Sequence, residues 1–221
     1  MTPPSPQSLQ PASMVDSHHP AVVAFAREHA RGADERERAV ALYYAVRDGF
    51  RYDPYQFYMS ESGLKASRVI ENGYGFCVPK AALLAAAARA SGVPARLGFA
   101  DVRNHLTNPR IDAMMEGDDI FRWHAYTSLF LDGKWVKATP AFDIRLCQRH
   151  KVKPLDFNGR DDSIFHEFDE NGRKHMEYVR FIGEFDDMPY EEFSSEMRKA
   201  YPRMLRELAE IRAARASRKA G

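Results

Sequence analysis

The feature that most constrains this sequence is a pair of β-prone runs joined by Asp132-Gly133. Residues 124–131 and 134–139 on either side are rich in aromatic and aliphatic side chains. An Asp-Gly pair between two such runs is a strong short-range signal for a two-residue turn. The two runs are therefore predicted to form a β-hairpin, and together with a strand predicted over 95–102 they indicate an antiparallel sheet.

A two-residue turn also fixes which residues of the hairpin lie opposite one another. Leu131 then faces Lys134, and the ladder continues until His124 faces Ala141. Side chains alternate along a strand, so one face of the sheet carries His124, Tyr126, Ser128, Trp135, Lys137 and Thr139.

His124 is the candidate general base in this hairpin. A catalytic histidine needs a partner that fixes which ring nitrogen carries the proton. Thr139 and Asp143 are its two diagonal neighbours in the predicted register, roughly 7–8 Å away at the backbone and within reach of side chains. Either fits the partner role, and Asp101 or a backbone carbonyl is the next candidate. The alternative is that His124 is a packed, hydrogen-bonded histidine without a chemical role.

A candidate nucleophile stands in the segment Asn-Gly-Tyr-Gly-Phe-Cys-Val-Pro-Lys at 72–80, which leads into the Ala/Leu-rich run 81–89. Glycines followed by strong helix formers predict a loop that turns sharply into a helix, with Pro79 in the first turn and Cys77 at or just before the N-terminus. Unpaired N–H groups and the helix dipole lower the pKa of a thiol there, and the same N–H groups could bind an oxyanion. Gly75 lets the backbone approach a substrate closely. Alternatively, Cys77 is a small buried residue, as most free cysteines are.

The composition is that of an ordinary globular protein. The 221 residues, 44% hydrophobic and 29% charged, suit one domain of the α+β or α/β class. Lys and Arg number 32 against 31 Asp and Glu, so no overall charge favours nucleic acid or an acidic membrane. No run approaches the roughly 20 apolar residues that cross a bilayer, and the first residues do not resemble a signal peptide. With only two cysteines, Cys77 and Cys147, we expect a reduced, cytoplasmic protein with Cys147 in its core.

The remaining segments divide the chain into a tail, a main domain and a C-terminal helix. The first residues are rich in Pro, Ser and Gln, a composition typical of disorder. Apolar residues recur at helical spacing over 19–30 and 34–47, and the polar stretch 145–192 is expected to form loops with short strands. The expected division is a disordered tail at 1–14, a catalytic domain at 15–190 and a C-terminal helix at 191–221.

Trp123, Tyr126, Tyr74 and Gly75 are the candidates for substrate binding, because they neighbour the proposed base and nucleophile in the sequence. Trp123 equally fits a packing role, with an indole N–H that could assist an oxyanion. The histidines, among them His105, invite a metal-site interpretation, yet the sequence has neither the His-Glu-x-x-His nor the Cys-x-x-Cys spacing. We therefore expect no metal and no cofactor, and His105 stands as an alternative base.

Taken together, these segments resemble the transglutaminase-like superfamily. The resemblance spans roughly residues 36–143 and implies a papain-like α+β core, in which a helix bearing the nucleophilic cysteine packs on an antiparallel sheet bearing histidine and, usually, aspartate. On that basis the catalytic residues are Cys77 and His124. The resemblance rests on Gly75-Phe76-Cys77 before an Ala/Leu-rich helix, Ser91-Gly-Val-Pro-Ala-Arg96, Trp123-His124-Ala-Tyr, and Asp132-Gly-Lys-Trp135.

One position departs from the family's pattern. Family members commonly have Asp-Pro-Thr four residues after the tryptophan that corresponds to Trp135, whereas this sequence has Thr139-Pro140-Ala141. Asp143 lies one step further along the same predicted face and could replace the missing carboxylate, or Thr139 could orient the ring through its hydroxyl. A third possibility is that the site is inactive.

The resemblance implies a thiol enzyme that transfers acyl groups from amide, peptide or isopeptide bonds through a thioester on Cys77. Hydrolysis is favoured over transfer to an amine, because the resemblance to prokaryotic members implies protease-like enzymes more often than cross-linkers. The expected partner is a peptide, protein or small amide substrate. The rival interpretation is a non-catalytic binding or scaffold protein with the same fold.

Overall fold

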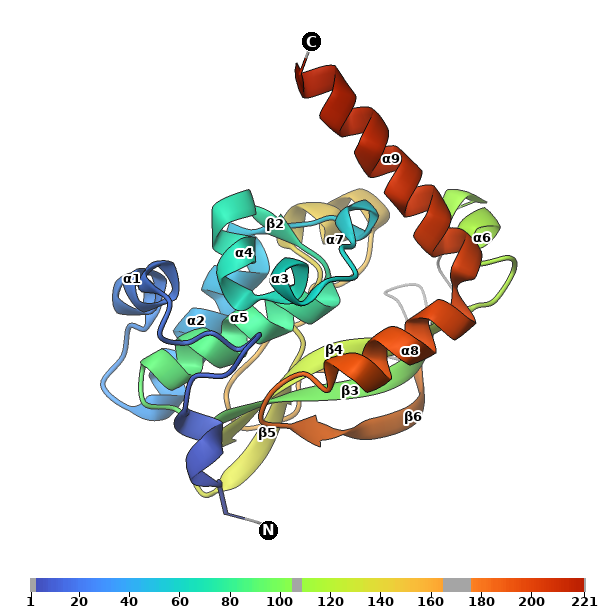
Figure 1. The fold of residues 1–221 in the computed structure, drawn as a ribbon. Coiled ribbons are helices and arrows are strands. Elements are labelled where there is room, and N and C mark those ends of the chain that lie inside the picture. Colours follow the sequence, from blue (N-terminus) through green and yellow to red (C-terminus); the bar gives the residue numbers. More distant parts are fainter. Residues whose placement is uncertain (1–2, 105–108, 165–175, 221) are drawn as a thin grey trace.

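A four-stranded antiparallel sheet lies at one side of the fold (Figure 1). The structure, a computed structural model, describes residues 3–104, 109–164 and 176–220. The strands stand in the order β5-β4-β3-β6, and each adjacent pair is antiparallel. They are β3 (Ala95–Asn104), β4 (Ile120–Leu131), β5 (Lys134–Ala138) and β6 (Met176–Phe185), and a separate parallel pair consists of β1 (Arg51–Tyr52) and β2 (Tyr74–Gly75).

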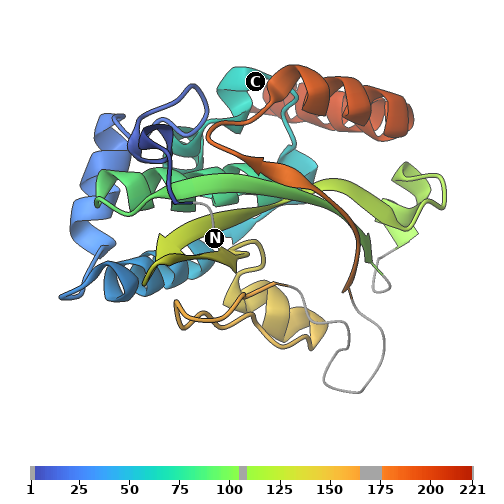
Figure 2. The ribbon, with the colours of Figure 1, turned by 90° about the horizontal axis from the view of Figure 1, so that it is seen from below.

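Helices cover one face of this sheet, which confirms the predicted α+β class. α5 and α8 lie across the sheet, and α9 extends away from it (Figure 1). Figure 2 shows α8 and α9 on one side of the molecule and α7 on the other, with α5 between them. The helices are α1 (Pro20–His29), α2 (Glu35–Gly49), α3 (Glu61–Leu64), α4 (Ala66–Asn72), α5 (Cys77–Ala90), α6 (Pro109–Met114), α7 (Ile144–His150), α8 (Tyr190–Ala200) and α9 (Pro202–Ala220), with 3-10 turns at Pro6–Leu9 and Pro54–Gln56.

Helix α5 is the centre of the packing. Every residue from Val78 to Arg89 is buried, because the helix is covered by β4 on one side and by α1, α2 and α4 on others. Gly73 ends α4 in the left-handed conformation, with φ of 73°, and redirects the chain toward the start of α5. The predicted turn from loop to helix is confirmed, with Cys77 as the first helical residue and Pro79 in the first turn.

The hairpin prediction is confirmed near the turn and wrong at the open end. Five pairs follow the predicted register, ending at Thr127 opposite Ala138. Beyond that pair the chain leaves β4, and the N–H of Thr139 donates to the carbonyl of Ser163. The next residue is a proline, which has no N–H with which to continue the ladder. The pairing predicted for His124 is therefore absent from the described β4–β5 ladder.

The segment for which we expected a disordered tail lies against the domain from residue 3 onward. It contains a 3-10 turn, and the carboxylate of Asp187 accepts the N–H groups of Ser13, Met14 and Val15 at 2.8, 3.2 and 3.1 Å. Composition suggested disorder because the segment has few apolar residues. The contacts that order it come instead from polar groups more than 170 residues away in the sequence.

The expected C-terminal helix is divided into α8 and α9, which meet at Tyr201 and Pro202. A proline cannot continue a helix through its missing N–H but fits the first turn of the next one. The hydroxyl of Tyr201 donates to the carbonyl of Ile120 and accepts the N–H of Arg122 at 2.8 Å, so this junction is fixed to β4. Upstream, β6 is a strand of ten residues where we expected short strands.

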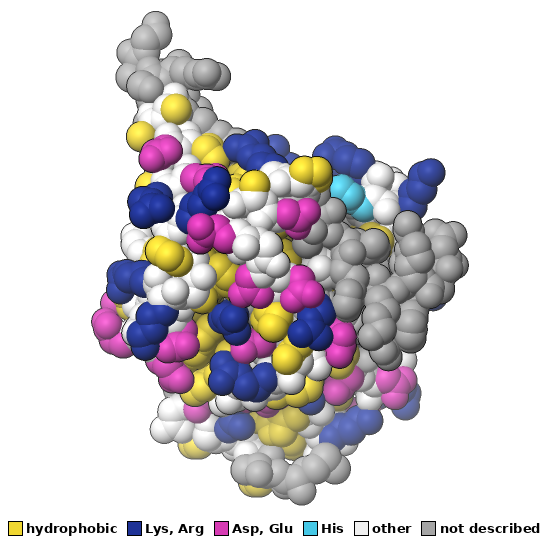
Figure 3. Space-filling model, turned by 90° about the vertical axis from the view of Figure 1, so that its right-hand side faces the viewer, with side chains coloured by type: hydrophobic (Ala, Val, Ile, Leu, Met, Phe, Trp, Pro, Cys, Tyr) yellow, Lys and Arg dark blue, Asp and Glu magenta, His cyan; other side chains and the backbone are white. Residues whose placement is uncertain are grey.

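The surface shows no single dominant character on the face drawn in Figure 3, where acidic and basic side chains are mixed with hydrophobic ones. Across the described ranges, no helix combines the length and the hydrophobicity needed to span a lipid bilayer.

Lys80 is a fully buried side chain in the first turn of α5. Its ammonium donates to the carbonyls of Arg47 and Phe50, at 2.9 and 2.8 Å, at the C-terminal end of α2. Burial lowers its pKa from 10.5 to about 7, although the charges of Asp143 and Asp48 act in the opposite direction. Lys80 thus satisfies carbonyls that a helix end leaves unpaired, and it connects the start of α5 to α2.

The free energy of unfolding of the wild-type protein, minus that of a Lys80→Met variant, should increase with pH. Between about pH 7 and pH 10 the unfolded chain keeps this lysine protonated while the folded chain does not, so stability increases with pH. The difference between the two proteins should grow by up to about 1.4 kcal/mol per pH unit in that range and be constant below about pH 6. Urea unfolding at several pH values measures it, and a difference independent of pH would contradict the lowered pKa.

Candidate active site

Cys77 lies at the N-terminal end of α5, where backbone N–H groups converge on its sulfur. The helix has no side-chain N-cap, because the preceding residue is Phe76. The N–H groups of Ala125, Val78 and Cys77 itself hydrogen-bond to the sulfur and favour its thiolate form. Since Ala125 belongs to β4, the sulfur is held between the end of the helix and the sheet.

Burial opposes these hydrogen bonds and outweighs them. It raises the pKa of the Cys77 thiol from 9.0 to about 11. The backbone N–H groups thus act in the direction expected from the sequence, but the pKa of the thiol is raised because burial has the larger effect. The position of the cysteine was predicted correctly, but desolvation depends on which distant segments cover it.

His124 lies on β4 and lines the same cavity as Cys77. Its side chain is buried, and burial lowers its pKa from 6.5 to about 3. At neutral pH the imidazole is therefore uncharged and has a ring nitrogen able to accept a proton. With Cys77 protonated, the two residues form a neutral thiol and imidazole rather than an ion pair.

A β-bulge brings His124 into this cavity. The pairing of β3 with β4 shifts by one residue between Ala100 and Val102. At the bulge Trp123 has φ of 56°, a left-handed conformation that is unfavourable for any residue but glycine. As a result Trp123 and His124 both line the cavity, although consecutive residues of a regular strand point to opposite faces.

Asp101 holds this bulge in place. Its buried carboxylate accepts the N–H of Trp123 at 3.1 Å through one oxygen, and the guanidinium of Arg180 on β6 at 3.1 Å through the other. Sequence reasoning suggested Asp101 as an alternative partner for the ring of His124. In the structure it binds the backbone immediately before the histidine.

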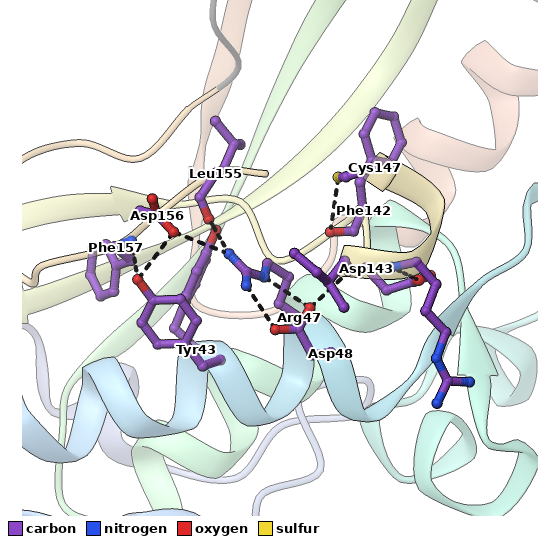
Figure 4. Close-up of polar contacts among 12 residues, drawn as sticks. Tyr43, Arg47, Asp48, Phe142, Asp143, Cys147, Leu155, Asp156 and Phe157 are labelled. Carbon is purple, nitrogen blue, oxygen red and sulfur yellow. Dashed lines mark hydrogen bonds and ion pairs between the residues drawn. The ribbon is translucent and has the colours of Figure 1, made fainter. Parts of the chain in front are cut away.

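Asp143, one predicted partner of His124, is the N-cap of α7. One oxygen accepts the N–H groups of Arg145 and Leu146, at 3.1 and 3.0 Å, and the other accepts the N–H of Tyr52 at 2.8 Å. Figure 4 shows Asp143 at the start of α7, next to the end of α2. Both oxygens of the carboxylate are thus engaged by backbone donors, and its pairing with His124 stays a prediction.

Thr139, the other predicted partner, is buried where the chain leaves β5. Its N–H donates to Ser163, and its carbonyl accepts the hydroxyl of Tyr43 at 3.3 Å. Its own hydroxyl has no hydrogen-bond partner among the residues that the structure describes. Neither Thr139 nor Asp143 lines the cavity shared by Cys77 and His124, so the partner role of Thr139 also stays a prediction.

A buried polar network fixes α2 against the segment that follows α7. Arg47 pairs with Asp48 at 2.7 Å and donates to the carbonyl of Leu155 at 2.6 Å, and the hydroxyl of Tyr43 donates to the same carbonyl at 2.7 Å (Figure 4). Cys147 lies buried beside this network, which confirms its predicted place in the core.

Of the four residues predicted to bind substrate, Trp123 lines the cavity and Tyr126 does not. The hydroxyl of Thr127, the next residue along β4, donates to the carbonyl of Ala81 in α5 at 2.8 Å. Tyr126 therefore faces the opposite side of the sheet, where its ring contacts that of Phe181 at 6.2 Å. Tyr126 is thus not among the residues that line the cavity.

Tyr74 and Gly75 do not line the cavity, and each packs against another part of the protein. The ring of Tyr74 lies under the guanidinium of Arg51 at 5.7 Å. Gly75 is buried, and a Cβ atom there would lie 3.1 Å from the side chain of Lys80. The close approach of Lys80 is a structural reason for the glycine, and its predicted role in substrate binding stays a prediction.

Sequence reasoning missed the wall that α8 and α9 contribute to the cavity. Phe193, Met197 and Tyr201 recur at intervals of four residues and line it together. This helical spacing was visible in the sequence, but nothing in it indicated the surface that these side chains cover.

The metal interpretation finds no support in the described ranges, where no three His, Cys, Asp or Glu side chains come close enough to hold an ion. The alternative base His105 lies outside the described residues.

The sequence matches the family model described as Transglutaminase-like superfamily over residues 23–140. The fold is similar to the crystal structure of a putative cysteine protease from Cytophaga hutchinsonii, with 18% identity and a TM-score of 0.45, over 60% of this chain and 40% of that one. It is also similar to a putative protease from Parabacteroides distasonis ATCC 8503, with 17% identity and a TM-score of 0.38, over 57% of this chain and 26% of that one. The matched part is thus less than half the length of either protein. No curated protein matches the sequence.

Alkylation of Cys77 by iodoacetamide should keep accelerating above pH 9, where a free cysteine reaches its maximum rate. The reactive species is the thiolate, and burial raises the pKa of this thiol to about 11. The rate should therefore rise about tenfold per pH unit between about pH 7 and pH 10. Peptide mapping separates the label on Cys77 from that on Cys147, and a Cys77→Ser variant supplies the background. A plateau below pH 8 would contradict the raised pKa.

Replacing Asp101 should disturb the site through the backbone of Trp123. Asp101→Leu leaves a buried N–H without its acceptor, which should cost about 1–3 kcal/mol of unfolding free energy and slow the reaction of Cys77 with iodoacetamide and with activated esters. Asp101→Asn keeps an oxygen in place and should retain most of the reactivity.

The matched control for this change is Arg180→Gln, which removes the other partner of Asp101 but leaves the bond to Trp123. The Arg180 side chain is 61% exposed, so its loss should cost less than about 1 kcal/mol. Equal losses of reactivity in Asp101→Leu and Arg180→Gln would show that the bond to Trp123 does not position the site.

Proposed function

Because this chain belongs to the transglutaminase-like superfamily, we propose that it is a cysteine-dependent hydrolase of amide or peptide bonds that acts through a thioester on Cys77. The observation that carries the proposal is the shared cavity of Cys77 and His124 at the N-terminal end of α5, where backbone N–H groups favour the thiolate form. A nucleophile, a base and donors for an oxyanion are the groups that acyl transfer needs.

In the proposed reaction, His124 takes the proton of the Cys77 thiol as the sulfur attacks the substrate carbonyl. The carbonyl oxygen gains negative charge, which the N–H groups at the start of α5 stabilise. The C–N bond then breaks, His124 returns the proton to the departing amine, and a thioester remains on Cys77. Water attacks the thioester while His124 accepts one of its protons. The carboxylic acid leaves, and the proton returns to the sulfur. The reaction uses no cofactor.

The protonation states favour a general-base mechanism over a preformed thiolate. A thiol with a pKa of about 11 beside an imidazole with a pKa of about 3 keeps its proton in the resting state. Proton transfer must therefore accompany attack on the carbonyl. Water or substrate polar groups that enter the cavity would solvate the imidazolium and shift both pKa values back toward their ordinary range.

A non-catalytic binding protein with the same fold is the second candidate. It is favoured by Thr139, which stands where family members commonly have aspartate and whose hydroxyl bonds to none of the described residues. A carboxylate stabilises the imidazolium formed during acyl transfer, and a hydroxyl can only orient the ring. The two candidates differ in whether Cys77 forms and releases an acyl group.

Mixing the protein with 4-nitrophenyl acetate should release a burst of about one equivalent of 4-nitrophenolate per chain, with the acetyl group on Cys77. Cys77→Ala should abolish the burst. His124→Gln should slow acylation by about 10²–10⁴-fold, since general-base catalysis contributes that much. Casein digestion followed by mass spectrometry tests for amide hydrolysis, and an added primary amine should leave the free acid as the main product.

Cys147→Ser is the control for this experiment, because it removes the other thiol, which does not line the cavity, and should leave the burst unchanged. Acetylation of Cys147 with Cys77 unmodified would reject the assignment of the nucleophile. A stable acetyl-Cys77 that water never releases, together with intact casein, would favour the binding protein.

A further inference from the structure

The cavity at Cys77 has one reactive end and one apolar end. Its volume is about 90 Å³, and Cys77, His124 and the half-buried Tyr52 stand at the reactive end. The cavity extends from there to α8 and α9. The side chains that line it on these two helices are Phe193, Met197, Tyr201, Met204 and Leu208.

The polar groups of the far end already have partners within the protein. The hydroxyl of Tyr201 is bonded to the backbone of both Ile120 and Arg122. The guanidinium of Arg122 binds Asp118 at 3.1 Å. Apart from the indole N–H of Trp123, the other side chains there are hydrocarbon or thioether groups, so a buried charge or the side-chain amide of a ligand would lose more hydration than the cavity can replace with hydrogen bonds. An aliphatic group loses nothing by entering.

Covalent chemistry decides which part of a substrate enters this cavity. In the thioester the acyl group is attached to the sulfur of Cys77, whereas the amine has left. The cavity that Cys77 and His124 line is an enclosed space in which a group attached to this sulfur can lie. Resting on the function proposed above, we propose that the cavity selects substrates whose acyl part carries an aliphatic group, such as the side chain of a leucine residue, next to the carbonyl that is attacked.

The size of the cavity limits that group. A cavity of about 150 Å³ lined by similar side chains holds benzene. At about 90 Å³ this one holds a smaller group, of roughly three to four carbon atoms in proportion to the six of benzene. A phenyl ring should therefore fit poorly unless a wall residue is shortened. The two methionines of α8 and α9 are unbranched and adapt to small differences in shape.

Acylation of Cys77 by N-acetyl amino-acid 4-nitrophenyl esters tests the proposal, with glycine, leucine, asparagine and phenylalanine as the amino acids. Leucine and asparagine side chains have nearly the same shape but differ in polarity. Each burst rate is divided by the rate of the same ester with glutathione, which removes intrinsic reactivity. The leucine ester should react about tenfold or more faster than the glycine ester, and about tenfold or more faster than the asparagine ester.

Two neighbouring variants on α9 locate the selectivity. Met204 lines the cavity, whereas Leu205 is equally half-buried but lies outside its lining. Met204→Ala should raise the rate of the phenylalanine ester relative to the leucine ester by about fivefold or more, because it enlarges the cavity. Leu205→Ala should leave this ratio within about twofold.

The outcomes separate this proposal from the one it rests on. Equal rates for the leucine and asparagine esters, with the acyl group on Cys77, would overturn the aliphatic preference and leave the hydrolase intact. A change of the phenylalanine ratio in Leu205→Ala as large as in Met204→Ala would overturn the location. Failure of every ester to acylate Cys77 would overturn both proposals. The comparison of esters uses the wild-type protein, so it holds even if a variant does not fold.

Discussion

Helix α5 is buried from Val78 to Arg89, so its N-terminal end at Cys77 is the part of the helix that a substrate can reach. Neighbouring elements cover it on its sides, and they can approach closely because half of its residues are alanine. Lys80 can be buried in this helix because its ammonium donates hydrogen bonds to two carbonyls at the end of α2. The same packing that stabilises the domain therefore determines where the thiol and its N–H groups lie.

The covering of the helix end has a chemical consequence. Hydrogen bonds to a thiolate and burial of the sulfur act on the pKa of Cys77 in opposite directions, and burial prevails. For His124 burial acts without an opposing influence of similar size. The resting pair is consequently neutral, and its reactivity depends on what enters the cavity.

Local signals in the sequence predicted the features that depend on neighbouring residues. The turn at Asp132-Gly133, the first five pairs of the hairpin and the helix that begins at Cys77 all follow from short-range rules. The predictions that failed depend on residues far apart in the sequence. The N–H of Thr139 donates to the carbonyl of Ser163 instead of pairing with β4. Asp101 accepts the N–H of Trp123 at a bulge that no local sequence pattern predicted.

Asp143 shows a different kind of limit. The predicted register continued the second strand of the hairpin through Pro140 and so placed Asp143 on the sheet. A proline has no N–H with which to continue the ladder, and the strand ends before it. The contacts of Asp143 are those of a helix N-cap, a role that its position before a short helical run would also have predicted. Two local interpretations were available for this residue, and the resemblance to a family favoured the one with a catalytic role.

The contacts of the N-terminal segment bear on the order in which this chain can fold during its synthesis. Ser13, Met14 and Val15 leave the ribosome early, yet the carboxylate that binds their N–H groups belongs to Asp187. Arg89 depends in the same way on the carbonyl of Asp186, and β3 must wait for β6. Contacts of such long sequence separation form late and slow the overall rate of folding. Until β6 has been synthesised and has paired with it, β3 is an open edge of an incomplete sheet, and such an edge favours aggregation.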